Sequence, residues 1–96
     1  MIDANILRRL GETIAERRNA EPSSSYVASL MAKGEDAILK KIAEEAAETL
    51  LAAKDGDKLH IVRETADLWF HTLVLLAALG PTDSRLVMAQ PLLALR

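Results

Sequence analysis

Two short runs of acidic residues have a spacing that could bind a cation. Glu44, Glu45 and Glu48 form the run EEAAE, and Glu64 and Asp67 form the run ETAD. Positions three and four residues apart share one face of an α-helix. Each run would therefore present its carboxylates on one side of a helix. Oxygen ligands of this kind suit a hard divalent ion such as Mg²⁺ or Mn²⁺.

The sequence DGD at 55–57 is a turn signal that lies between the two runs. Glu48 lies seven residues before this turn and Glu64 lies seven residues after it, so we expect the two to face each other. Glu45 would then lie one helical turn further along, opposite Asp67. Two like charges 4 Å apart repel by about 4 kcal/mol at an effective dielectric constant of ~20. Such a cluster must retain protons or bind a divalent cation.

Simpler interpretations of these residues remain open. One acidic pair on a helix is usually a solvated face, and neighbouring Lys and Arg side chains are often ordinary surface partners. His60 and His71 share the stripe of Glu64 and Asp67, so a zinc or di-iron centre is conceivable. Their offsets do not match the Glu-x-x-His pattern of di-iron bundles, however. We expect His71 in the core or beside the site, and His60 in solvent near the turn.

The composition indicates a small helical domain. The 96 residues are 50% apolar but only 3% aromatic, and they predict one domain spanning 1–96. A chain this short has a thin core, so its surplus of apolar residues predicts a second copy that covers part of them. The net charge of −2 argues against nucleic acid and membrane partners. Without cysteine, a signal peptide or a bilayer-length apolar segment, the chain is expected to be cytoplasmic.

Apolar residues recur at helical spacing throughout and no strand pattern occurs, so the predicted class is all-α. The two long helices should pack as antiparallel neighbours, because the loop between them is short. Shorter helices should precede and follow them. The expected helices run from an Asp3 cap to about 17–18, from a Ser24 or Ser25 cap to Gly34, from 35 to 54, from 58 to 79, and from a Thr82 or Asp83 cap toward Pro91.

The segments at 25–54, SYVASLMAKGEDAILKKIAEEAAETLLAAK, and 63–80, RETADLWFHTLVLLAALG, together resemble the phosphoribosyl-ATP pyrophosphatase family. That family belongs to the wider all-α NTP pyrophosphatases, which include MazG-like proteins and dimeric dUTPases. The shared signature is E-E-x-x-E followed by E-x-x-D on the next helix, which matches the two acidic runs. The lead-in that begins at Ser25-Tyr26 and ends at Lys40-Lys41 narrows the resemblance to the histidine-biosynthesis branch.

The resemblance implies hydrolysis of phosphoribosyl-ATP to phosphoribosyl-AMP and pyrophosphate, with Mg²⁺ required. It also implies a homodimer and leaves larger assemblies open. The tail SRLVMAQPLLALR departs from the family pattern. A chain of this length has no room for the cyclohydrolase to which this domain is sometimes fused, so we expect the free-standing form. The metal ligands that the resemblance implies are Glu45, Glu48, Glu64 and Asp67. Glu44 would be a further ligand, or would orient or deprotonate the attacking water. The candidates for binding substrate are Lys33, Lys40, Lys41 and Arg63.

Two alternatives use the same residues. One is a house-cleaning pyrophosphatase of the same fold that acts on nucleoside triphosphates or dUTP, because the acidic signature does not select the base. The other is a non-enzymatic helical dimerisation module with acidic stripes on its surface. The number of metal ions and the carboxylate that activates water are not determined by the motif.

Overall fold

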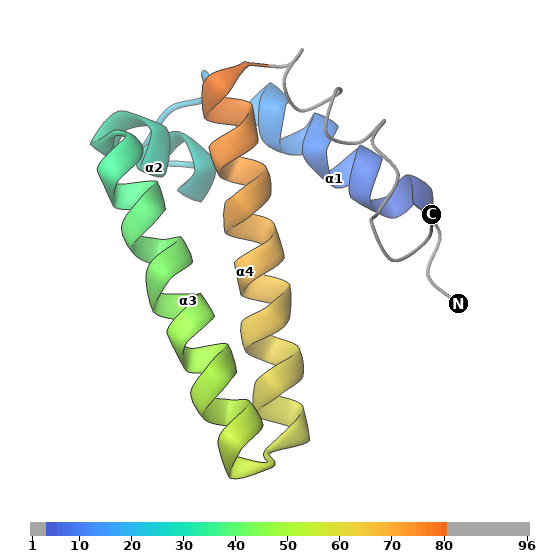
Figure 1. The fold of residues 1–96 in the computed structure, drawn as a ribbon. Helices are drawn as coiled ribbons and strands as arrows, with labels where there is room; N and C mark the ends of the chain where they lie inside the picture. Colours follow the sequence, from blue (N-terminus) through green and yellow to red (C-terminus); the bar gives the residue numbers. More distant parts are fainter. Residues whose placement is uncertain (1–3, 81–96) are drawn as a thin grey trace.

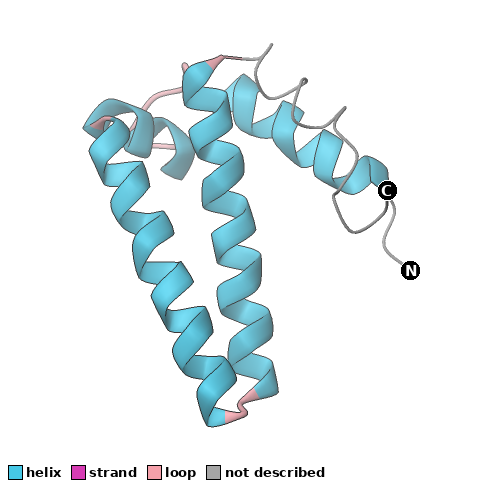
Figure 2. Cartoon of the chain, in the orientation of Figure 1, coloured by secondary structure: helices cyan, strands magenta, loops and turns pink. Residues whose placement is uncertain are grey.

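The computed structural model describes residues 4–80, and in this range the chain forms four α-helices (Figure 1). No strand occurs among the described residues, as Figure 2 shows, which confirms the all-α prediction. The Asp3 cap, the last short helix and the bend at Pro91 were also predicted, but they lie outside the described residues. The helices are α1 (Ala4–Arg17), α2 (Tyr26–Lys33), α3 (Glu35–Asp55) and α4 (Lys58–Leu79).

The long helices α3 and α4 lie side by side as an antiparallel hairpin (Figure 1). Gly56 ends α3 with φ +72°, a left-handed conformation that glycine adopts without a Cβ penalty. The Asp57 backbone N–H then donates to the carbonyl oxygen of Ala52 at 3.2 Å. The Asp57 carboxylate accepts from the backbone N–H of His60 at 3.1 Å and so caps α4. The predicted turn is therefore confirmed, and it sets the level at which the two acidic runs meet.

The short helix α2 begins and ends at local signals. Ser25 is its N-cap, because the Ser25 hydroxyl accepts from the backbone N–H of Ala28 at 3.3 Å. Gly34 follows the helix with φ +99°, and its N–H donates to Leu30 and Met31 carbonyl oxygens. A positive φ is accessible to glycine at little cost, so the chain can turn from α2 directly into α3.

The core lies at the end of the hairpin away from the turn, where α1 and α2 pack against it (Figure 1). Near the turn, in contrast, several large apolar side chains are exposed in the single chain, including Leu50, Leu51, Leu59 and Val62. None of the four helices has the length and apolar content needed to cross a membrane. The buried core consists of Ile14, Val27, Leu30, Ile38, Leu73, Val74 and Ala77.

Candidate metal centre

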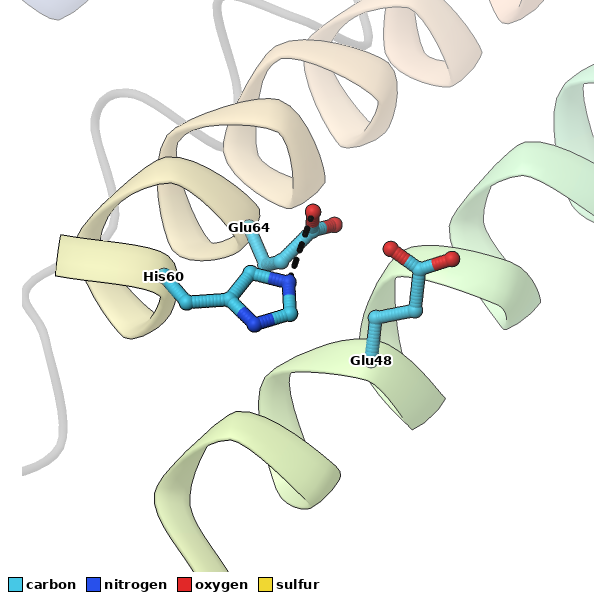
Figure 3. Close-up of side chains that lie close together, drawn as sticks. All are labelled: Glu48, His60 and Glu64. Carbon is cyan, nitrogen blue, oxygen red and sulfur yellow. Dashed lines mark ion pairs between the residues drawn. The ribbon is translucent and has the colours of Figure 1, made fainter. Parts of the chain in front are cut away.

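Glu48, His60 and Glu64 form a group of potential metal ligands between the two long helices (Figure 3). Glu48 extends from α3, and the other two extend from α4 one helical turn apart. One ligand atom from each lies within 4.8 Å of the others. His60 Nε2 lies 3.4 Å from Glu64 Oε1. The structure thus brings Glu48 and Glu64 together, as the spacing around the turn predicted, and adds His60 to them.

The environment of Glu64 favours its protonated form. Desolvation is the largest cause that raises the pKa of Glu64 above the usual glutamate value, followed by a hydrogen bond with Glu48 and by the charge of that residue. The charge of Asp67 acts in the same direction, whereas His60 opposes it. A proton on Glu64 is therefore favoured over a negative charge beside Glu48, and a bound cation would replace that proton.

The Glu45 carboxylate lies between the helices but contacts His71 instead of the first group. Glu45 is 9% exposed and His71 is 5% exposed. His71 Nδ1 is 2.9 Å from the backbone carbonyl oxygen of Asp67, so this nitrogen carries the proton and donates to that oxygen. Glu45 Oε1 lies 2.6 Å from the same nitrogen, yet this buried oxygen has no hydrogen bond within the described part of the chain.

Tyr26 completes this arrangement from α2. The Tyr26 hydroxyl and His71 Nε2 form a hydrogen bond of 2.7 Å, in which the hydroxyl donates when the imidazole carries its proton on Nδ1. Burial raises the pKa of the Tyr26 hydroxyl, and among the nearby charges Lys41 lowers it while Glu45 and others raise it. Tyr26 and His71 also pack edge to face with ring centroids 5.7 Å apart. Tyr26 and His71 thus link α2 to the acidic face of the hairpin.

The remaining candidate residues lie around these two groups. Glu44 and Asp67 are exposed, but their charges act on the Tyr26 hydroxyl, so they lie near it. Lys41 is half-buried on the same side of α3. Of the other basic candidates, Lys33, Lys40 and Arg63 are all exposed.

The donors present suit a divalent cation. Glu45 is a buried carboxylate whose Oε1 atom pairs with His71 Nδ1 at 2.6 Å, and carboxylate oxygens are the ligands that hard divalent ions prefer. The raised pKa of Glu64 points to a need for positive charge beside Glu48 and Glu64. The i, i+4 spacing placed His60 on the stripe of Glu64 and Asp67, and its expected solvation agrees with a side chain that is 45% exposed. Its approach to Glu48 is what the structure adds.

A cavity of about 260 Å³ lies elsewhere, at the end of the hairpin that α1 and α2 cover. Arg18, Glu35 and Leu79 are among its lining residues, and none of the acidic-run residues lines it. The chemistry suggested by the carboxylates therefore belongs to the acidic face that α3 and α4 share, not to this cavity.

Comparison with known proteins gives one consistent result. The family model described as phosphoribosyl-ATP pyrophosphohydrolase matches residues 7–85, a span that includes both acidic runs. A phosphoribosyl-ATP pyrophosphatase of Chromobacterium violaceum is 63% identical over 84 residues, covering 88% of this chain and 78% of that protein. The protein of the same name from Azoarcus sp. is 64% identical over 80 residues, covering 83% and 75%.

A third relative, from Neisseria gonorrhoeae, bears the same name and is 57% identical over 72 residues, or 75% of this chain and 67% of that protein. The matches span α1 to α4 and the acidic face of the hairpin. We conclude that this chain belongs to the phosphoribosyl-ATP pyrophosphohydrolase family.

Proposed function

We propose that this chain hydrolyses phosphoribosyl-ATP to phosphoribosyl-AMP and pyrophosphate, the second step of histidine biosynthesis, and that residues 1–96 act as one domain. The observation that carries the proposal is the family match, which spans nearly all of the described helices. The hairpin of α3 and α4 supports it, because one carboxylate of each acidic run, Glu48 and Glu64, meets the other there. A triphosphate is strongly anionic, so a cation is needed before acidic side chains can act on it.

Mg²⁺ is the proposed cofactor, with Mn²⁺ as a substitute, and the residues that would hold it are Glu45, Glu48, Glu64 and Asp67. All four offer carboxylate oxygens, which are the ligands that Mg²⁺ prefers. When bound, the ion neutralises phosphate charge and makes a water molecule more acidic. Glu45 would contribute a buried carboxylate oxygen, and the cation would replace the proton that the raised pKa of Glu64 favours.

The other residues have proposed roles in orienting water and substrate. Glu44 is exposed beside the acidic face, where its carboxylate can hold a water molecule in line with a phosphate or accept its proton. Lys41 is half-buried among the acidic residues, so its ammonium can pair with a phosphate oxygen. Lys33, Lys40 and Arg63 are exposed and would contact the outer parts of the substrate.

A homodimer is proposed because each long helix carries an uncovered apolar stripe on the side away from the acids. At about 100° per residue, the stripe lies roughly 180° around α3 and 150° around α4 from the acidic runs. Leu50, Val62 and Trp69 within it are 69%, 63% and 51% exposed in the single chain. A second hairpin packed here would form a four-helix bundle. The apolar stripe consists of Leu39, Ala43, Ala46 and Leu50 on α3, and of Leu59, Val62, Ala66 and Trp69 on α4.

The decisive experiment measures pyrophosphate release from phosphoribosyl-ATP with Mg²⁺ and with a chelator. We expect release only with the metal ion, and faster release than from any member of a panel of nucleoside triphosphates that includes dUTP. Preference for another nucleotide would replace the proposed substrate. No turnover of any nucleotide would instead favour a non-enzymatic dimerisation module.

Variants test the site within the same assay. Glu48→Gln and Asp67→Asn should each reduce pyrophosphate release by at least about a hundredfold, because each removes a charge needed to hold the cation. Glu12→Gln is the matched control, since Glu12 is an exposed acid on α1, outside both the acidic runs and the lead-in. Circular dichroism should give the same helix content for all three variants. Full activity of both site variants would refute the proposed ligand set.

A further inference from the structure

His60 is a potential nitrogen ligand that lies outside the acidic signature. Its Nε2 atom is 3.4 Å from Glu64 Oε1, and both belong to the group that Glu48 completes from α3 (Figure 3). Two carboxylate oxygens and one imidazole nitrogen, all within 4.8 Å of one another, are close enough to bind one ion. The acidic signature by itself would supply oxygen ligands only.

The backbone holds this histidine in place. Its backbone N–H donates to Asp57 Oδ1 at 3.1 Å, and the next N–H, that of Ile61, donates to the Asp57 carbonyl oxygen at 2.9 Å. The first turn of α4 is therefore capped at the position from which the imidazole extends. His60 and Glu64 are four residues apart on this ordered helix, so both side chains lie on the face that is turned toward Glu48.

The second histidine of the chain is already engaged and does not compete for this role. His71 is 5% exposed, its Nδ1 atom is in contact with Glu45 and Asp67, and its Nε2 atom is bonded to Tyr26. The side chain of His60, in contrast, is 45% exposed, and its closest described charged partner is Glu64. The imidazole that can reach an ion entering from solvent is therefore that of His60.

Imidazole nitrogen changes which ions a carboxylate site prefers. Mg²⁺ favours oxygen, whereas Zn²⁺ binds histidine nitrogen and carboxylate oxygen together, and divalent ions late in the first transition series bind such mixed sites more tightly. We infer that His60, Glu48 and Glu64 form a site for a divalent transition-metal ion of the Zn²⁺ type at the turn-proximal end of the acidic face. The inference rests on the proposed function in that Glu48 and Glu64 are also its Mg²⁺ ligands, so the two ions compete.

The test uses Zn²⁺ alone and the whole metal-free chain. With ¹⁵N-labelled histidine, the two imidazoles of each chain give two sets of nitrogen resonances, and His60→Gln identifies which set belongs to His60. We expect Zn²⁺ to shift the Nε2 resonance of His60 to a metal-bound value and to leave His71 unchanged. Unchanged His60 resonances at saturating Zn²⁺ would overturn the inference.

Calorimetric titration supplies a second readout. His60→Gln should weaken Zn²⁺ binding at least tenfold and change Mg²⁺ binding less than about threefold, since only Zn²⁺ gains from the nitrogen. Equal Zn²⁺ affinity of the variant and the parent chain would show that His60 is not a Zn²⁺ ligand and only pairs with Glu64 at the surface. Neither readout involves turnover. A chain that binds Zn²⁺ through His60 but releases no pyrophosphate would contradict the proposed function alone. A chain that releases pyrophosphate but whose His60 does not respond to Zn²⁺ would contradict this inference alone.

Discussion

At the scale of single residues, the acidic face is built around carboxyl groups whose neighbours oppose their ionisation. Glu64 is the clearest case, because loss of solvent, the hydrogen bond that its protonated carboxyl group donates to Glu48 and the charge of Glu48 all raise its pKa. Glu45 is a second carboxylate at this site, and it is buried with Oε1 2.6 Å from His71 Nδ1. Such side chains favour a cation over water, and their behaviour without one can be measured directly.

The stability of the metal-free protein should fall as pH rises through the titration of Glu64. Because the pKa of Glu64 is raised in the folded chain, its contribution to stability is fully present below the usual glutamate pKa and is lost as pH rises through the raised value. Glu48→Gln removes the facing charge from α3, so this loss should be smaller in the variant, while His60 and Asp67 still face Glu64 from α4. Urea-unfolding midpoints, measured against pH in the presence of a chelator, give the pH dependence of stability for the parent chain and for Glu48→Gln. The same pH dependence in both would contradict the interaction between Glu48 and Glu64.

With Mg²⁺ present, the contribution of Glu64 to stability should increase with pH instead of decreasing. The proton and the cation compete for Glu64, so Mg²⁺ affinity should increase with pH across the range in which Glu64 loses its proton. Thermal melts at fixed Mg²⁺ concentration report this as a stabilisation that grows with pH. Mg²⁺ stabilisation that is independent of pH would place the ion away from Glu64.

The hydrogen bond between Tyr26 and His71 should contribute to folding. Tyr26→Phe removes the 2.7 Å bond and leaves the buried Nε2 atom of His71 without a partner, which should cost about 1 kcal/mol of unfolding free energy. A double-mutant cycle with His71→Phe isolates the pair, because the effect of Tyr26→Phe should then disappear. An undiminished effect in the His71→Phe background would assign the loss to the packing of the ring.

At the scale of secondary structure, residues close to each helix end determine where that helix begins or ends. Ser25 caps α2, Asp57 caps α4, and Gly34 and Gly56 allow the backbone to leave α2 and α3 with positive φ. These residues act through their own backbone or through atoms three positions away, so their effects do not depend on the rest of the fold. The turn between α3 and α4 matters most for the site, because it places the two acidic runs at the same position along the two antiparallel helices.

Two glycine substitutions should change stability in opposite directions. Gly56→Ala forces a Cβ into the left-handed conformation at φ +72° and should destabilise the protein by about 1–2 kcal/mol. Gly11→Ala lies inside α1, where an added Cβ meets nothing within 4 Å, and should stabilise it by about 0.5–1 kcal/mol. Urea unfolding measures both. Destabilisation by Gly11→Ala would mean that a second chain packs against this face of α1.

At the scale of the whole molecule, the core and the acidic face occupy different parts of the hairpin. The core is formed where α1 and α2 cover the ends of α3 and α4 (Figure 1). Toward the turn the acidic runs line one side, and the apolar stripe defined above faces away from them. A single chain leaves this stripe in water, which is unfavourable for so large a contiguous apolar surface.

Adjacent leucines on α3 provide a matched test of the dimer. Leu50 lies in the apolar stripe, whereas Leu51 is similarly exposed, at 63%, but is directed about 100° away around the helix. Leu50→Glu should weaken the dimer at least tenfold, because it places an unpaired charge in the interface, and Leu51→Glu should leave the dimer intact. Sedimentation velocity over a concentration series measures both. Equal sedimentation of Leu50→Glu and the parent chain would exclude this face as the interface.

The helix boundaries and the alignment of the two acidic runs across the turn could be predicted, because both depend on residues that are close in the sequence. The prediction from periodicity and turn residues matches α4 at both ends and α3 to within one residue at Asp55. The spacing around the turn likewise predicts that Glu48 meets Glu64, as the structure shows. These features follow from 3.6 residues per turn and from capping, which act over a few residues.

The partners of individual side chains on the acidic face required the tertiary structure. The sequence put His60 on the acidic stripe near the turn, but the structure alone shows that its imidazole lies close to Glu48 and that Glu45 pairs with His71. Likewise, apolar residues at helical spacing predicted the helices, but only the packing of α1 and α2 shows that Leu59, Val62 and Trp69 stay exposed in the single chain. The physical reason is that side-chain contacts depend on the rotation and separation of packed helices, which distant residues determine together.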